Sequence, residues 1–118
     1  MNNFKVEDLE IKISVNGDTY NMKWSGRSES RNPGEVLNPY LDSLMPDFTG
    51  KNLVVDYCAL EYMNSSTVPP IIRFVKACNT NNIETTVQYK KDSEWQSASF
   101  KPLQTVCSLL KKVKVIGV

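Results

Sequence analysis

The sequence predicts an α/β fold in which an open, mixed β-sheet begins with an N-terminal hairpin and carries about three helices packed against it. Three observations support this prediction. The hydrophobic period is two at the start of the chain and then alternates between helical and strand spacing. A mostly apolar run of eight residues, 53–60, occupies the centre. With 118 residues, 41% hydrophobic and 23% charged, the chain has the size and composition of one globular domain, spanning 1–118.

The first two strands are predicted by strict alternation. Apolar residues alternate with polar ones over 9–15 and again over 20–24, and Asn16, Gly17 and Asp18 separate the two runs. Such a pattern is typical of a β-hairpin. The polar segment 26–33 reads as a turn. A helical stripe follows in 34–44, but Pro39 is awkward inside a helix, so the regular helix is expected at about 37–46 with an irregular lead-in.

The rest of the chain repeats strand and helix. Residues 53–60 are apolar on both sides, which predicts a central strand covered on both faces. A helical stripe from Ile71 to Cys78 ends in the turn residues 79–82. The remaining elements are a strand at 83–89, a polar loop at 90–97, a helix marked by Phe100 to Leu110 with Lys111 and Lys112 in its last turn, and a short strand at 113–118. Right-handed crossovers then give an open mixed sheet.

The most informative stretch joins the central strand to the next helix. It reads Glu-Tyr-Met-Asn-Ser-Ser-Thr-Val-Pro-Pro over 61–70 and places three hydroxyls, those of Ser65, Ser66 and Thr67, at a strand-to-helix corner. A helix start leaves backbone N–H groups unpaired and favours negative charge, so a phosphate added there would find donors. The alternative is that one of these residues simply caps the helix.

The prolines constrain this corner. Because a proline lacks the N–H, Pro69 and Pro70 must lie in the first turn, and the helix can hardly begin before about residue 66. Thr67 is then expected as the N-cap, and Ser65 should lie exposed just outside the regular helix. The two prolines also remove donors that would otherwise bind an anion.

Residue usage excludes several function classes. The chain has no histidine, so Ser-His-Asp and Cys-His catalysis and histidine-ligated metals are impossible within it. The chain has three cysteines, an odd number, and no CxxC motif; they are Cys58, Cys78 and Cys107. This pattern indicates buried thiols and suggests neither a disulfide framework nor a zinc site. A net charge of +1 gives no footprint for nucleic acid or an anionic membrane. The N-terminus has no apolar leader and no run is long enough to span a bilayer, so the protein is expected to be cytoplasmic. No cofactor is expected.

Three further features have competing interpretations. Trp95 in the polar loop could anchor a partner or fold back onto the core. The lysines at 111, 112 and 114 read better as helix-end charges than as a nucleic-acid patch. Asp56 and Glu61 flank the end of the central strand but lack a complementary base, which argues against acid-base catalysis.

The corner and the order of elements resemble the STAS fold of anti-sigma-factor antagonists. The likeness covers roughly residues 18–118 and rests on an apolar strand ending in Tyr62-Met63, the Asn64-Ser65-Ser66 corner, an apolar helix, and then strand, loop, helix and terminal strand. Asn64 and the upstream polar segment 26–33 make it closer to the SiaC-type regulatory phosphoproteins. The antagonist class has Asp-Ser-Ser-Gly at this corner, so Asn64, Thr67 and the two prolines are departures from its pattern.

The resemblance implies a function without catalysis by this chain. Ser65 corresponds to the hydroxyl phosphorylated by a partner Ser/Thr kinase and dephosphorylated by a PP2C-type phosphatase, with Ser66 next and Thr67 third. Tyr62, Asn64, Ser65 and Trp95 are the expected partner-binding residues, and a downstream signalling protein in a bacterial partner-switching pathway is the expected partner. The alternative is a STAS-like adaptor or assembly module that uses the same surface without phosphorylation. A small enzyme or nucleotide-binding protein is a third possibility, disfavoured by the lack of histidine, of a Gly-rich phosphate loop and of convergent acid-base residues.

Overall fold

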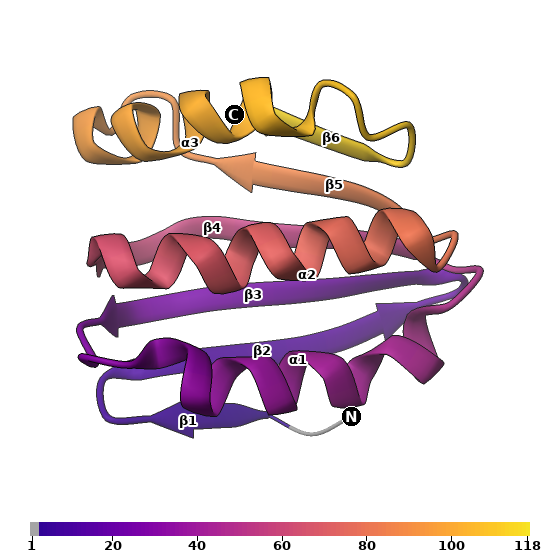
Figure 1. Ribbon diagram of the computed structural model, residues 1–118, viewed down its shortest axis with the longest axis horizontal. Coiled ribbons are helices and arrows are strands. Elements are labelled where there is room, and N and C mark those ends of the chain that lie inside the picture. Colours follow the sequence, from indigo (N-terminus) through magenta and orange to yellow (C-terminus); the bar gives the residue numbers. More distant parts are fainter. Residues whose placement is uncertain (1–2) are drawn as a thin grey trace.

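Alternating apolar side chains build one six-stranded sheet, with three α-helices packed on it (Figure 1). The computed structural model describes residues 3–118. The strands, in sheet order, are β1 Phe4–Val6, β2 Leu9–Asn16, β3 Thr19–Ser28, β4 Asn52–Met63, β5 Glu84–Tyr89 and β6 Val113–Gly117. The helices are α1 Pro33–Phe48, the short 3₁₀ helix η1 Ser65–Thr67, α2 Val68–Thr80 and α3 Glu94–Cys107.

The sheet is mixed, as predicted. Strands β1, β2 and β3 pair antiparallel, whereas β3, β4, β5 and β6 run parallel with helical crossovers between them. The β2–β3 hairpin confirms the predicted opening motif. The extra edge strand β1 was not predicted, because three residues are too few to show a period of two.

The helices cover one face of the sheet only (Figure 1). On β4, Leu53, Val55 and Tyr57 are buried beneath them, while Val54 and Asp56 on the other face are half-exposed. The prediction that the central strand is covered on both faces is therefore wrong. An apolar run shows only that both sides of a strand are shielded to some degree, and here neighbouring side chains on the open face provide part of that shielding.

Strand β3 extends further than its sequence suggests. Residues 26–28 were expected in a turn, but they continue the strand through a β-bulge beside β4. Gly26 has a φ of +84°, and a Cβ there would lie 1.9 Å from the carbonyl oxygen of Asp8, so only glycine fits. As a result the end of β3 lies beside the end of β4, with Ser28 opposite Met63.

Helices α1 and α3 begin earlier than expected. Helix α1 begins at Pro33, where the missing N–H is harmless, and it tolerates Pro39 and Pro46 on its exposed side. Helix α3 begins at Glu94, inside the expected polar loop, because the Ser93 hydroxyl accepts a bond from the backbone N–H of Gln96 at 3.4 Å.

Helix α3 also ends earlier, at Cys107, so the lysines at 111 and 112 lie beyond it and not in its last turn as predicted. Lys112 instead pairs with Glu84 of β5, with 3.0 Å between Nζ and Oε1.

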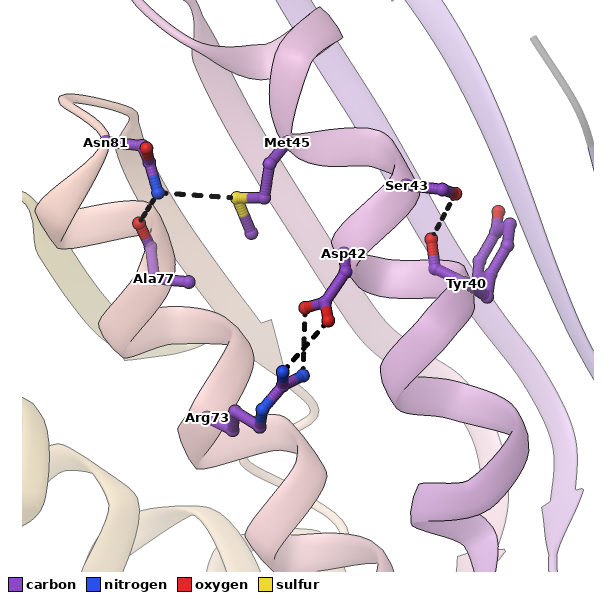
Figure 2. A network of polar contacts seen from close by, with 7 residues as sticks. All are labelled: Tyr40, Asp42, Ser43, Met45, Arg73, Ala77 and Asn81. Carbon is purple, nitrogen blue, oxygen red and sulfur yellow. Dashed lines mark hydrogen bonds and ion pairs between the residues drawn. The ribbon is translucent and has the colours of Figure 1, made fainter.

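Polar contacts join α1 and α2 side by side on the sheet (Figure 2). Arg73 of α2 binds both carboxylate oxygens of Asp42 of α1, at 2.8 and 2.9 Å. Asn81, at the end of α2, donates its side-chain amide to the carbonyl of Ala77 at 2.7 Å. The helix stop predicted at 79–82 is confirmed, since α2 ends at Thr80.

Candidate functional site

The corner between β4 and α2 has the predicted geometry at its helix start. Asn64 is extended, residues 65–67 form η1, and α2 begins at Val68 with Pro69 and Pro70 in its first turn. Thr67 occupies the N-cap position, as expected, but its side chain makes no capping bond. The hydroxyl of Thr67 is used elsewhere.

A chain of hydrogen bonds encloses Thr67. The residue is fully buried, and its hydroxyl donates to Oδ1 of Asn64 at 2.8 Å and lies 2.7 Å from the hydroxyl oxygen of Ser28. Because Thr67 has a single hydroxyl proton, Ser28 must be the donor of the second bond. A kinase therefore cannot reach the Thr67 oxygen unless the corner opens.

Asn64 joins the corner to the segment before α1. Its side-chain amide donates to the backbone carbonyl of Ser30 at 2.8 Å, while its carbonyl oxygen accepts from Thr67. Its backbone N–H donates to the carbonyl of Ser28 at 3.0 Å. An aspartate could accept from Thr67 but could not donate to Ser30, so the amide has a structural role at this position.

The other two hydroxyl residues, Ser65 and Ser66, are exposed. Beside them Tyr62 is 40% exposed, and the guanidinium of Arg27 lies 4.8 Å from the centroid of its ring. Arg27 also pairs with Glu29 at 2.6 Å. The sequence interpretation missed Ser28 and Arg27 as neighbours of the corner, and only the parallel pairing of β3 with β4 could have indicated them.

Trp95 lies in the first turn of α3 and not in a loop. It is half-buried and packs against the core, so it partly folds back while keeping an exposed edge. The next residue, Gln96, donates to the carbonyls of Tyr57 and Leu60 at 2.9 Å each. These bonds hold the start of α3 against the second half of β4, which leads into the corner.

The remaining candidates form no reactive cluster. Asp56 accepts a bond from the backbone N–H of Cys58 at 2.8 Å, and Glu61 is exposed. Within residues 3–118 no group of three potential metal ligands is found. Burial raises the pKa of Cys78 to about 12 and that of Cys58 to about 11. Both thiols therefore stay protonated and weakly nucleophilic at neutral pH.

The buried thiol of Cys78 predicts a loss of stability in alkali. The pKa of the Cys78 thiol in the folded protein is about 12, raised by desolvation from about 9. Its contribution to the free energy of unfolding is therefore complete below pH 9 and declines as the pH rises toward 12. The free energy of unfolding, measured in urea between pH 7 and 11, should fall by up to ~1.4 kcal/mol per pH unit from this group. Cys78→Ala should be less stable at pH 7 but show a shallower decline above pH 9. An equal decline in both proteins would exclude Cys78 as the cause.

The enclosed hydroxyl of Thr67 predicts a stability effect of its own. Thr67→Val keeps the shape of the side chain but removes both hydroxyl bonds, and urea unfolding should show a loss of about 1–3 kcal/mol. The matched change Thr80→Val, at an exposed threonine of α2, should cost less than ~1 kcal/mol. Equal costs would show that the Ser28, Thr67 and Asn64 bonds add no stability.

The fold has known counterparts among solved structures. No protein-family model matches the chain, and a comparison with curated proteins finds no match. Among solved structures, an anti-sigma factor antagonist from Mycobacterium paratuberculosis superposes with a TM-score of 0.63 at 13% identity, over 94% of this chain and 90% of that one.

A second solved structure is an uncharacterized protein of the DUF3478 family from Shewanella loihica, described as having a SpoIIAA-like fold. It gives a TM-score of 0.55 at 12% identity, over 96% of this chain and 88% of that one. The chain thus has the SpoIIAA-like α/β fold expected from its resemblance to STAS domains. None of the helices in residues 3–118 is long and apolar enough to cross a membrane.

Proposed function

We propose that this chain is a non-enzymatic regulatory protein of a bacterial partner-switching pathway, controlled by reversible phosphorylation at the corner 64–67. The observation that carries the proposal is the unequal exposure of the three hydroxyls. Ser65 and Ser66 face solvent, while Thr67 is fully buried and bonded on both sides. Ser65 is the proposed acceptor because it stands directly after Asn64, at the position of the phosphorylated hydroxyl in the resembling class.

The switch would act through charge. A Ser/Thr kinase transfers a phosphoryl group to the Ser65 oxygen, which adds about −1.5 to −2 charge at pH 7, and a PP2C-type phosphatase removes it. The added charge falls three residues after the exposed Tyr62 and directly after Asn64, whose side chain binds the Ser30 carbonyl. A partner that packs on Tyr62 would lose affinity through desolvation and repulsion. Loss of binding is the direction that the family resemblance implies.

In this proposal the protein acts in the cytoplasm, and the SiaC-type resemblance suggests a downstream signalling protein as its partner. Tyr62, Asn64, Ser65 and the exposed edge of Trp95 would contribute to the partner surface.

Intact-mass spectrometry tests the modification. Protein isolated from its own cells should carry one phosphoryl group, about 80 Da, that treatment with a phosphatase removes. Fragmentation should place the group on Ser65. A single unmodified mass under all growth conditions would favour the static adaptor, and phosphate on Ser66 would move the acceptor by one residue.

A further inference from the structure

Exposed apolar side chains are frequent in the part of the chain that forms the end of α3 and the last strand, away from the corner 64–67. Of the seven large hydrophobic residues that are exposed within residues 3–118, four lie in the last thirteen positions. They are Val106, Leu109, Ile116 and Val118. Leu109 is 90% exposed, more than any other large apolar side chain described.

The same edge offers unpaired backbone groups. Strand β6 is the last strand and pairs with β5 only. The carbonyl of Lys112 and the N–H of Val118 point to β5, at 2.8 Å from their partners, so the even-numbered residues face β5. The backbone groups of Val115 and Gly117 therefore point outward. One of them, the carbonyl of Val115, accepts a bond from the side chain of Gln104 at 2.8 Å.

The side chains around this edge alternate in chemistry. Val113 and Val115 lie on the helix side, where a groove of about 370 Å³ runs between α3 and β6. Lys114 and Ile116 lie on the open face of the sheet and are exposed. A strand added to β6 would place alternate side chains in the same two environments, one beside the apolar end of α3 and one beside Lys114.

The positive charge of this edge favours a partner with acidic side chains. Residues 84–118, which form β5, α3 and β6, carry six basic and three acidic side chains, so positive charge predominates on the β6 side of the sheet. Lys111 and Lys114 are exposed, and neither makes an ion pair with any described residue. A second copy of this chain would bring the same lysines to the contact, whereas carboxylates would complement them.

We propose that the free edge of β6 and the end of α3 bind an extended segment of a partner protein in which acidic side chains alternate with apolar ones. The segment adds a seventh strand to the sheet. Its backbone pairs with the N–H of Val115 and with both backbone groups of Gly117, and its acidic side chains lie beside Lys114. Its apolar side chains enter the groove lined by Cys107, Val113 and Val115, next to Leu109, which follows the lining residue Ser108. This site is separate from the corner 64–67 and does not depend on phosphorylation.

The test uses a short, end-blocked peptide of alternating glutamate and valine, titrated into the full chain and followed by NMR. Saturating peptide should slow amide hydrogen exchange at Val115 and Gly117, the two residues whose N–H groups point outward. A peptide of alternating lysine and valine should bind at least about tenfold more weakly. Lys111→Glu combined with Lys114→Glu should weaken binding of the glutamate peptide about tenfold.

Matched variants separate this edge from general surface effects. Lys5→Glu combined with Lys23→Glu makes the same charge change at exposed positions of β1 and β3 and should leave binding unchanged. Leu109→Ser should weaken binding, whereas Val15→Ser, at an exposed valine of β2, should not. Unchanged exchange at Val115 and Gly117, or equal binding of the two peptides, would overturn the proposal. Sedimentation showing dimers that Lys114→Glu stabilises would identify a second copy as the occupant and overturn it too.

Discussion

Gln96→Ala is expected to lower the free energy of unfolding by about 3 kcal/mol, because it leaves several buried backbone groups without partners. Strand β4 continues past the end of β5, with the last paired residues being Asp56 and Gln88. Beyond that point the side-chain amide of Gln96 donates to the carbonyls of Tyr57 and Leu60, and its oxygen accepts from the backbone N–H of Lys90 at 2.7 Å. The Gln96 side chain thus supplies hydrogen bonds that a neighbouring strand would otherwise make to β4.

The same helix supplies a matched control. Gln104 also donates to one backbone carbonyl, that of Val115, but its side chain is exposed and water can replace the bond. Gln104→Ala should therefore cost less than ~1 kcal/mol, whereas Gln96 is 1% exposed and its partners cannot be hydrated in place. Urea unfolding followed by circular dichroism gives both values. Equal costs for the two variants would show that Gln96 does not supply the missing pairing.

The hydrophobic period was sufficient to predict the fold class because most elements are longer than one period. The β2–β3 hairpin, β4, α2 and β5 all lie where alternation or a helical stripe placed them. Features that depend on distant residues could not be predicted in this way. Gln96 reads as one more polar residue of a loop, and its role appears only once α3 lies against the unpaired part of β4. The uncovered sheet face was missed for the same reason.

In the candidate site, too, only the features determined by residues close in sequence could be predicted. The position of the helix start follows from Pro69 and Pro70 alone, and the structure confirms it. The exposure of Ser65, predicted from the prolines, is confirmed. The enclosure of Thr67 does not follow from the local sequence, because its partner Ser28 lies thirty-nine residues earlier in the chain. A row of three hydroxyls therefore resolves into one structural residue and two accessible ones.

Ser65→Glu is expected to weaken binding of the signalling partner roughly 5- to 150-fold, the usual range of coupling between a modification and a binding site. Ser65→Ala should bind as the unmodified protein does and remain insensitive to the kinase. The physical reason is the charge that the glutamate places three residues after the exposed Tyr62, on a corner that the Asn64 bonds hold in one conformation. A partner captured on Ser65→Ala, then identified and purified, can be titrated against each variant by calorimetry.

Two controls make this experiment decisive about the acceptor. Ser66→Glu adds the same charge one residue further along η1, where the side chain is also exposed, and should weaken binding less. Thr67→Val should lower stability but weaken binding far less than Ser65→Glu does, because it adds no charge and the Thr67 hydroxyl is enclosed. If Ser66→Glu has the larger effect, Ser66 is the acceptor. If neither glutamate changes the affinity, the corner is not a charge switch, and the static adaptor becomes the better account of this surface.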